Sequence, residues 1–323
     1  MKYYFAPMEG ITGYIYRNAH HRVYGQMDQY FTPFLVPNQT RKLSSRELND
    51  ILPEHNQGVP LVPQIMTNKA DDFLWAARKI RELGYGEVNL NLGCPSATVV
   101  TKNRGAGFLA FPSELDQFLK AVCRELEPMG MKLSIKTRIG KERPEEFLRL
   151  LEIFNQYKLE KLIIHPRVQT DFYKNHPNLE VFAQAAADST NPVCYNGDLF
   201  TLEAVTAFCR RFPQIEEIMI GRGLLANPAL VPAAKGEEPE RPDKSRLREF
   251  HDAVLEGYLQ VMSGDRNVLF KMKELWYYLG CSFEEFPKYG KKIKKAQKVS
   301  DYTSAVDQLF AEQELKSHPG FAI

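Results

Sequence analysis

The sequence predicts an α/β protein: a (β/α)8 barrel of the TIM type followed by a small all-helical C-terminal domain. Short apolar runs alternate with longer amphipathic stretches up to about residue 230. A charged segment with two prolines then interrupts this alternation at residues 235–242, and only helical periodicity follows it. We therefore expect a barrel domain over residues 1–235 and a helical domain over residues 243–323. A doubly wound open sheet is the alternative architecture.

Eight short apolar runs are the expected strands of the barrel. They cover residues 3–6, 29–34, 61–66, 87–91, 132–136, 161–165, 193–196 and 217–220. Four of the intervening stretches place apolar residues three and four positions apart, as an amphipathic helix does. These stretches are 71–83, 113–126, 144–157 and 202–212. Eight strands with interleaved helices in about 230 residues match the size and element order of a closed parallel barrel.

The C-terminal region shows helical patterns alone. Residues 247–262, 268–279 and 303–315 have the spacing of amphipathic helices, and no convincing strand occurs among them. A run of residues 288–298 holds six lysines and no acidic residue. Such a run is often a solvated basic face over a helical core, and it also suits the phosphates of a nucleic acid.

The composition is typical of a globular protein and indicates no particular binding partner. The chain is 44% hydrophobic and 25% charged, with a formal net charge of +2, so any affinity for nucleic acid must come from local patches. No apolar run approaches the roughly 20 residues that span a bilayer, and the N-terminus lacks a secretory signal. The five cysteines are widely dispersed, which favours neither a metal site nor a disulfide framework. We expect a monomeric cytoplasmic protein without metal or membrane association.

Polar or reactive residues follow many of the expected strands. Gln64, Asn91, Lys136, His165 and Asn196 each lie at or near the end of an apolar run. In a barrel, the carboxyl ends of the strands meet at one face, where catalytic groups gather. This recurrence predicts an enzyme, with its active site at that face.

Several short motifs resemble those of the dihydrouridine synthase family, and they follow one another along the chain in the family's order. The N-terminal motif covers residues 6–12, and the cysteine signature is Asn91-Leu92-Gly93-Cys94-Pro95-Ser96. The remaining motifs are Gln64-Ile65-Met66, Lys136-Thr137-Arg138, His165-Pro166-Arg167, Asn196-Gly197-Asp198 and Ile220-Gly221-Arg222-Gly223. The resemblance covers essentially the whole barrel. The sequence departs from the family pattern after Pro95, where a lysine is common, and at Asp171, where a glutamine is common.

The resemblance implies FMN-dependent reduction of the C5–C6 double bond of uridines in tRNA to 5,6-dihydrouridine, with NADPH as reductant. No side chain supplies hydride, so the flavin would deliver it to C6. Cys94 would donate the proton to C5, since an ordinary thiol stays mostly protonated at neutral pH. The alternative for Cys94 is that of a small buried hydrophobe.

The resemblance also assigns cofactor contacts. The expected FMN-binding residues are Pro7, Met8, Glu9, Gln64, Lys136, His165, Asn196, Gly197, Asp198, Gly221 and Arg222. Structural alternatives remain for several of them: core packing for Met8, a solvated rim position for Glu9, and a lysine that extends from the barrel rim for Lys136. His165 has a structural alternative too, and the glycines after the last two strands also suit simple turns.

Substrate contacts are expected from both regions. Asn91 and Arg167 would contact the uracil or a phosphate, although Asn91 also suits a turn-capping role. In the helical domain the expected RNA-binding residues are Lys271, Lys273, Lys291, Lys292, Lys294 and Lys295. Two other functions stay open: a dihydroorotate dehydrogenase-like flavin barrel that acts on a free pyrimidine, and a non-catalytic RNA-binding protein.

Overall fold

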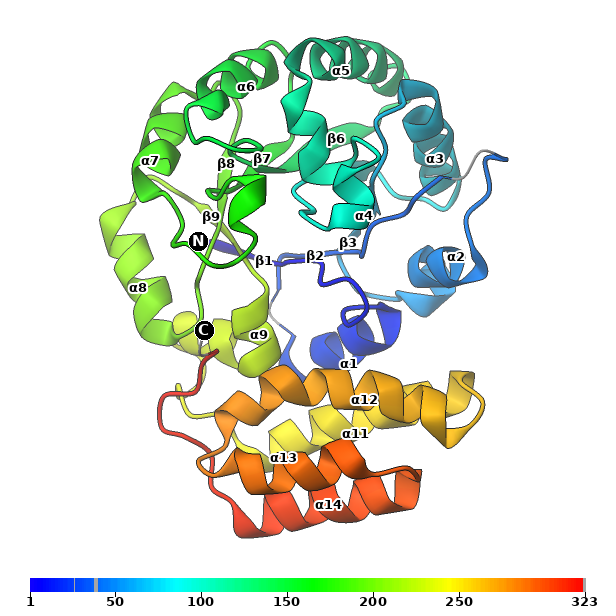
Figure 1. Ribbon diagram of the computed structural model, residues 1–323, viewed down its shortest axis with the longest axis vertical. Helices are drawn as coiled ribbons and strands as arrows, with labels where there is room; N and C mark the ends of the chain where they lie inside the picture. The colour runs from blue at the N-terminus through cyan, green and yellow to red at the C-terminus, as the bar shows by residue number, and fades with distance from the viewer. Residues whose placement is uncertain (26, 38–39, 322–323) are drawn as a thin grey trace. The chain divides into compact units, whose positions relative to one another are not determined.

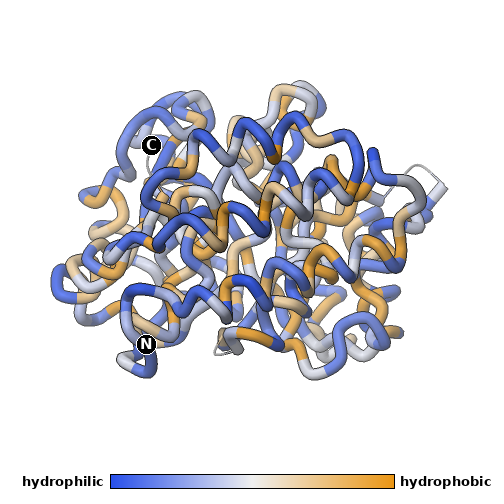
Figure 2. Tube along the Cα trace, turned by 90° about the horizontal axis from the view of Figure 1, so that it is seen from below, coloured by the Kyte–Doolittle hydropathy of each residue, from blue (hydrophilic) through white to orange (hydrophobic). Residues whose placement is uncertain are grey.

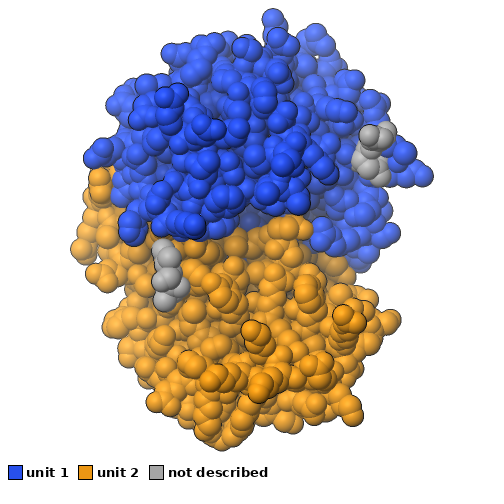
Figure 3. Space-filling model, in the orientation of Figure 1, with its two compact units in different colours: residues 1–7, 29–197, 214–219 blue, residues 8–28, 198–213, 220–323 orange. Residues whose placement is uncertain are grey.

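The computed structural model describes residues 1–25, 27–37 and 40–321. The chain forms two compact units, which Figure 3 shows in different colours. Unit 1 comprises Met1–Pro7, Gln29–Gly197 and Gln214–Met219, and unit 2 comprises Met8–Asp28, Asp198–Pro213 and Ile220–Ile323. The boundary that we place near residue 240 stays a prediction.

Within the described residues, nine parallel strands form one sheet that is nearly closed into a barrel (Figure 1). They are β1 (Lys2–Phe5), β2 (Gln29–Phe31), β3 (Leu61–Val62), β4 (Gln64–Ile65), β5 (Glu87–Leu92), β6 (Lys132–Arg138), β7 (Lys161–His165), β8 (Val193–Asn196) and β9 (Glu217–Ile220). Their order is β3-β2-β1-β9-β8-β7-β6-β5-β4. Because only Pro63 separates β3 from β4, the two ends of this order belong to one extended segment, and the sheet returns on itself. The prediction of a (β/α)8 barrel is confirmed.

The expected strands match the observed ones closely. Residues 161–165, 193–196 and 217–220 form β7, β8 and β9 with the predicted bounds. The second strand is shorter than predicted and ends at Phe31, two residues before Pro33, which has no N–H to donate. Strand β6 extends two residues beyond Lys136, so Arg138 also belongs to it.

Helices of unit 1 follow its strands. They are α2 (Ser45–Ile51), α3 (Ala70–Glu82), α4 (Ala97–Val100), α5 (Pro112–Leu126), α6 (Glu146–Phe154) and α7 (Leu179–Asp188). Helices α3, α5, α6 and α7 follow one another around the strands in Figure 1. We did not predict α7, whose alanine-rich sequence has a weak apolar period. Asn178 starts it as an N-cap, where its side chain accepts a hydrogen bond from the backbone N–H of Val181.

Unit 2 is helical in its C-terminal part, as predicted. Its helices are α1 (Tyr14–Tyr24), α8 (Leu202–Arg211), α9 (Arg222–Ala226), α10 (Leu230–Ala234), α11 (Lys244–Val261), α12 (Asp265–Leu279), α13 (Phe286–Lys295) and α14 (Val299–Glu312). Helix α13 coincides with most of the lysine run and was not predicted as a helix, because Pro287, Gly290 and the lysines obscure its period. Tyr289 and Ile293, four residues apart, form its buried side. Figure 2 shows repeated changes between hydrophilic and hydrophobic residues along the helical traces.

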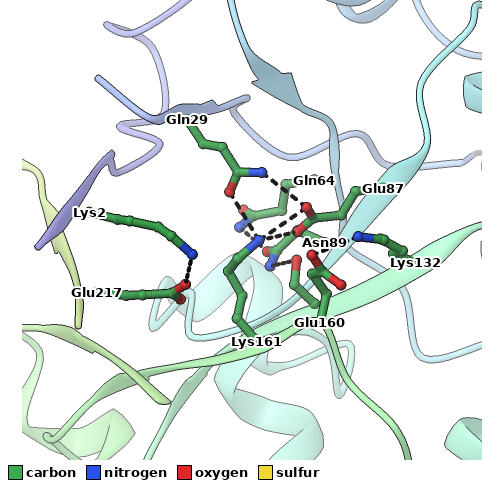
Figure 4. A network of polar contacts seen from close by, with 10 residues as sticks. Lys2, Gln29, Gln64, Glu87, Asn89, Lys132, Glu160, Lys161 and Glu217 are labelled. Atoms are coloured by element: carbon green, nitrogen blue, oxygen red, sulfur yellow. Dashed lines mark hydrogen bonds and ion pairs between the residues drawn. The ribbon is translucent and has the colours of Figure 1, made fainter. Parts of the chain in front are cut away.

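The barrel interior of unit 1 contains an apolar layer and a polar layer. The apolar cluster consists of Tyr4, Ala6, Phe31, Val62, Ile163, Cys194 and Met219. In the polar layer the ammonium of Lys161 on β7 lies 2.9 Å from a carboxylate oxygen of Glu87 on β5 and donates to Gln29 on β2 (Figure 4). Both charges are nearly inaccessible to solvent, so this pair connects strands through the barrel interior. In the described part of the chain, no helix is long and apolar enough to cross a membrane.

Candidate active site

The strand register brings several predicted site residues together at the carboxyl ends of β5, β6 and β7. Asn91 lies directly beside Lys136, and Arg138 lies directly beside His165. Lys136 and Arg138 are two residues apart on β6 and therefore point to the same side of the sheet. The four side chains form a polar patch in unit 1.

Cys94 follows β5 in a short turn, residues 93–95, which we call the cysteine turn. The side-chain oxygen of Asn91 accepts hydrogen bonds from the backbone N–H groups of both Gly93 and Cys94, each at 3.0 Å. The turn-capping interpretation of Asn91 therefore holds in the structure. The side-chain nitrogen of Asn91 donates to the oxygen of Gln64 at 2.6 Å, so the amide that caps the turn is itself oriented.

All three carbonyl oxygens of the cysteine turn accept hydrogen bonds from distant segments. The Gly93 carbonyl accepts from Nε of Arg138 at 3.0 Å, and the Cys94 carbonyl accepts from the backbone N–H of Ala106 at 3.1 Å. The Pro95 carbonyl accepts from Nε2 of Gln169 at 3.1 Å. Three separate segments thus fix the backbone that carries the half-buried Cys94.

A close backbone contact also supports the cysteine turn. Gly105 has φ of +54°, and a Cβ atom at this position would lie 2.8 Å from the carbonyl oxygen of Cys94 and 3.0 Å from its Cβ. Both the backbone conformation and the space require glycine here. The segment after α4 therefore packs tightly behind the cysteine.

Lys136 carries a perturbed amine. Burial, and after it the charge of Arg138, lower the pKa of Lys136 to about 8. The groups that raise it are the thiols of Cys194 and Cys94, and no carboxylate is among the causes of the shift. An anionic ligand beside this ammonium would stabilise its charged form.

His165 and Arg167 form a pair on β7 and the loop after it. Nη1 of Arg167 lies 3.0 Å from Nε2 of His165, and both residues are buried. Because a guanidinium only donates, Nε2 of His165 accepts, and the ring proton of the neutral imidazole lies on Nδ1. Nε of Arg167 donates to the carbonyl of Asn175. Arg167, which we expected to contact substrate, is thus engaged by the protein and orients the imidazole.

Gln64 is a buried residue of β4. It is fully buried, donates to the Asn89 side chain at 2.8 Å and accepts from Asn91. Asn89 in turn donates to the hydroxyl of Ser134 at 2.9 Å. This chain of amides across β4, β5 and β6 holds Asn91 in place.

The predicted site residues at the ends of β8 and β9, the last two strands, have different partners. In unit 1, Asn196 is buried and donates to the Met219 carbonyl at 2.8 Å, and a Cβ at Gly197 would meet the hydroxyl of Tyr195 at 2.0 Å. These two residues therefore have packing roles of their own.

In unit 2, Arg222 pairs with Asp198 at 2.9 Å, and its guanidinium lies over the ring of Phe200 at 4.7 Å. Gly221 precedes this arginine as the N-cap of α9, and Gly223 allows the Leu199 carbonyl to approach within 2.2 Å of where a Cβ would lie. The guanidinium of Arg222 and the closely packed backbone beside it suit the binding of a phosphate group.

The N-terminal motif divides between the units. Pro7 is half-buried at the end of unit 1. In unit 2, Met8 is half-buried and makes reciprocal hydrogen bonds with the Thr12 hydroxyl, while Glu9 is exposed. The carbonyl of Gly10 accepts from Lys271 at 2.7 Å. Lys271, which we expected to contact RNA, thus ties α12 to this motif.

The other predicted RNA-binding lysines are divided between tethered and exposed positions. Lys273 donates to the carbonyl of Ala296 at the end of α13. Five lysines of α13 are exposed: Lys288 and the four predicted RNA-binding residues Lys291, Lys292, Lys294 and Lys295. A shallow groove of about 440 Å³ between α13 and α14 is lined by two of them, Lys292 and Lys295, with Gln308 opposite.

Sequence reasoning missed three residues that organise the cysteine turn: Arg138, Gln169 and Gly105. Arg138 is buried and also donates to the carbonyls of Val168 at 2.8 Å and Phe172 at 2.7 Å. Its place two residues after Lys136 was the available signal, because alternate residues share one side of a strand. Gln169 and Gly105 carried no comparable signal. Among the described residues, no cluster of three or more potential metal ligands occurs.

Structural relatives share the barrel. A morphinone reductase mutant in complex with tetrahydroNAD superposes with a TM-score of 0.52 at 12% identity, covering 76% of this chain and 89% of the other. The old yellow enzyme from Trypanosoma cruzi superposes with a TM-score of 0.51 at 10% identity, covering 81% and 94%. At these identities the likeness shows the fold.

Sequence relatives are more specific. A tRNA-dihydrouridine(16) synthase of Pseudomonas putida is 30% identical over 236 residues, which cover 71% of this chain and 72% of the relative. One from Vibrio vulnificus is 25% identical over 318 residues, 96% of each chain. The profile of the family described as dihydrouridine synthase (Dus) matches residues 4–314. The chain therefore belongs to the dihydrouridine synthase family, whose members are flavin-dependent oxidoreductases.

Proposed function

We propose that this enzyme reduces the C5–C6 double bond of uridine in tRNA to 5,6-dihydrouridine, with bound FMN as cofactor and NADPH as reductant. The observation that carries the proposal is the fixed cysteine turn, which holds Cys94 next to Asn91 and Lys136 at the carboxyl ends of β5 and β6. The shared name of the sequence relatives favours the uridine at position 16 as the target.

The residues present fit an FMN. Bound FMN supplies the hydride, which no side chain provides. The ammonium of Lys136, with its lowered pKa, suits negative charge on the flavin ring, and Arg222 suits the phosphate. Asn196, Gly197, Asp198 and Gly221 supply the surrounding backbone. Pro7, Met8, Glu9, Gln64 and His165 complete the cofactor contacts in the proposal.

Cys94 donates the proton that C5 requires once hydride has reached C6. A general acid must hold its proton until that moment and must lie where the carbon forms its new bond. The three hydrogen bonds that the turn carbonyls accept and the two that its N–H groups donate to Asn91 fix the backbone that carries the Cys94 side chain. Asn91 affects the substrate mainly by holding this turn in place.

The helical region binds the RNA in this proposal. A uracil inside folded RNA must leave its stack before its C5–C6 bond becomes accessible, so the protein must hold the surrounding strand. The exposed lysines of α13 supply charge for the phosphates. Such a substrate places the enzyme in the cytoplasm, where we propose that it acts as a monomer.

The test compares three substrates, two of which are tRNA transcripts, and two proteins. Purified enzyme with NADPH is incubated with unmodified tRNA, with the same tRNA carrying cytidine at position 16, and with free uridine. Dihydrouridine is then mapped by mass spectrometry. We expect product at position 16 of the first transcript only. Cys94→Ala should keep its yellow flavin and lose most of the product.

Two outcomes would contradict the proposal. Preferential turnover of free uridine would favour a free-pyrimidine reductase of the dihydroorotate dehydrogenase-like kind. A purified protein that takes up no FMN and makes no dihydrouridine would favour a non-catalytic RNA-binding role.

A further inference from the structure

Phe172 lies in the loop after β7 with an unusual backbone. Its φ is +50° and its ψ is −97°. Three described residues other than glycine have positive φ: Arg41, Asn103 and Phe172. Asparagine tolerates this region better than most residues, whereas a bulky side chain there is a true outlier. Phe172 is therefore strained, at a position where glycine would be relaxed.

The surrounding structure imposes this strain. The carbonyl of Phe172 accepts from Nη2 of Arg138 at 2.7 Å, and its N–H donates to the Gln169 carbonyl at 3.1 Å. The side chain of Asp171 accepts from the N–H of Val168 at 3.1 Å and closes the same loop. Such conformations persist only where neighbours determine them, and they cluster where ligands bind.

The strain is not offset by burial of the ring. The phenyl group of Phe172 is 43% exposed, whereas large apolar side chains in the core of unit 1 are below a tenth exposed. Burial of this ring therefore stabilises the fold less than burial of a core phenylalanine does. This combination points to a ligand that covers the ring.

The position of Phe172 identifies the kind of ligand. The guanidinium of Arg138 donates to the carbonyls of Gly93, Val168 and Phe172. One planar group thus joins the backbone of Phe172 to the residue that precedes Cys94. This loop is thus fixed to the cysteine turn, which in the proposed function faces the flipped uridine and its neighbouring nucleotides.

We infer that Phe172 stacks on a nucleobase of the RNA next to the target uridine. The inference rests on the proposed function, since it takes the RNA to be the substrate. A phenyl ring offers an apolar face to a base of any sequence, and such stacking strengthens binding without reading hydrogen bonds. Phe172 is a binding residue and takes no part in proton or hydride transfer.

Three variants separate stacking from backbone strain. Phe172→Leu keeps the Cβ and the apolar character but lacks the ring, Phe172→Gly also relieves the strain, and Phe172→Tyr keeps a ring. Affinity of the flavin-loaded protein for unmodified tRNA is measured without NADPH. We expect the leucine and glycine variants to bind roughly 5- to 100-fold more weakly and the tyrosine variant to bind like the parent.

Controls exclude a general loss of structure. The thermal midpoint of Phe172→Gly should equal or exceed that of the parent protein, because glycine is relaxed at this φ. Leu148, which is 60% exposed on α6, provides the matched surface change: Leu148→Ala should leave tRNA affinity unchanged.

Two results would overturn the inference. One is a Phe172→Leu variant with the affinity of the parent protein. The other is slower reduction of the flavin by NADPH with unchanged tRNA affinity, which would assign the ring to the nicotinamide instead. Failure of the proposed function would look different: the parent protein would form no dihydrouridine, whatever the RNA affinity of the Phe172 variants.

Discussion

At the scale of single residues, Gly105 supports the cysteine turn because it has no side chain. Its Cα packs against Cys94, and a methyl group there would meet the cysteine backbone and the Val99 side chain, the latter at 2.9 Å. The segment that contains Gly105 thus limits where the cysteine can lie.

We expect Gly105→Ala to displace the cysteine turn. The substitution adds both the strain of positive φ, about 1–2 kcal/mol, and overpacking of about 1–3 kcal/mol. Gly130→Ala is the matched control, since Gly130 has φ of +66° with open space around it. Urea denaturation should show the larger loss of stability for Gly105→Ala, and dihydrouridine formation should fall only in that variant. Equal losses of stability and full activity in both would contradict the contact.

The pKa of Lys136 shows how burial changes the titration of a lysine. Its pKa is lowered to about 8 by burial and by Arg138, whereas an unfolded lysine titrates near 10.4. Between these two pH values the unfolded chain binds more protons at this residue than the folded chain. The contribution of Lys136 to the stability of the flavin-free protein therefore increases as pH rises through this window.

We expect Lys136→Met to remove this contribution. The difference in unfolding free energy, parent minus variant, should increase between pH 7.5 and pH 9.5 when flavin-free proteins are unfolded in urea. Because other titrating groups are common to both proteins, the difference isolates Lys136. A difference that stays constant or decreases over this range would mean that the amine keeps an ordinary pKa.

At the scale of elements, the loop after β7 and the cysteine turn are joined by side chains. Gln169 donates to the carbonyl of Pro95, and Arg138 donates to carbonyls on both segments. The loop also carries Arg167, which orients His165. Movement of either segment therefore affects the other.

We expect Gln169→Met to loosen the cysteine turn. Methionine has a similar length but no donor for the Pro95 carbonyl, so Cys94 should react several-fold faster with iodoacetamide, as measured by peptide mass spectrometry. Cys281 provides an internal reference thiol. Gln156→Met makes the same change at an exposed position on the outside of unit 1 and should leave Cys94 unaffected. Equal rates in both variants would show that the Gln169 bond does not restrain the cysteine.

Helix α13 concentrates charge that the chain as a whole lacks. The net charge is only +2, yet five exposed lysines lie on this one helix. Tyr289 and Ile293 anchor its other side. The amphipathic division follows from the sequence once the helix is known.

Neutralising four of the α13 lysines should weaken tRNA binding. Each lost phosphate contact reduces the slope of log affinity against log salt by about 0.7–0.9. With glutamine at all four positions the slope should fall by up to about 3, as measured by fluorescence anisotropy at several salt concentrations. The substituted residues are Lys291, Lys292, Lys294 and Lys295.

The control is a protein with the same change of net charge in unit 1. Four exposed lysines there provide it: Lys79, Lys120, Lys132 and Lys158. This variant should keep most of the salt slope. If both variants lose the same slope, the effect is one of total charge, and α13 has no special role.

At the scale of the whole molecule, barrel closure depends on contacts between strands far apart in the sequence. Lys161 on β7 bonds Glu87 on β5 and Gln29 on β2 in the polar layer of the interior (Figure 4). The Lys161 ammonium also lies 5.4 Å from the ring centre of Tyr4 on β1. This layer lies below the residues of the active site on the same strands.

We expect Lys161→Met to cost about 3–5 kcal/mol of stability, because it leaves the buried carboxylate of Glu87 without its partner. The double variant with Glu87→Gln should recover a large part of that loss. Urea denaturation of both proteins measures the two values. A double variant that is less stable than the single one would show that the pair is not the source of the loss.

Much of the fold was predictable because strands and helices leave local patterns. Strands β7, β8 and β9 coincide with the predicted ranges, and the polar residues predicted at strand ends lie there. Helices α7 and α13 were missed, because alanine gives α7 a weak apolar period, and Pro287 and Gly290 in α13 are poor helix formers. That Arg167 contacts substrate stays a prediction, whereas its hydrogen bonds to His165 and Asn175 arise only in the folded loop.

The sequence by itself determined the barrel, the family and the identity of Cys94, since periodicity and short motifs are local properties of the chain. Only the tertiary structure decided what holds that cysteine. Arg138 is 45 residues from Gly93, and Gln169 is 74 residues from Pro95. Contacts of such separation leave no local pattern, and the pKa of Lys136 and the strain at Phe172 likewise arise from neighbours that folding assembles.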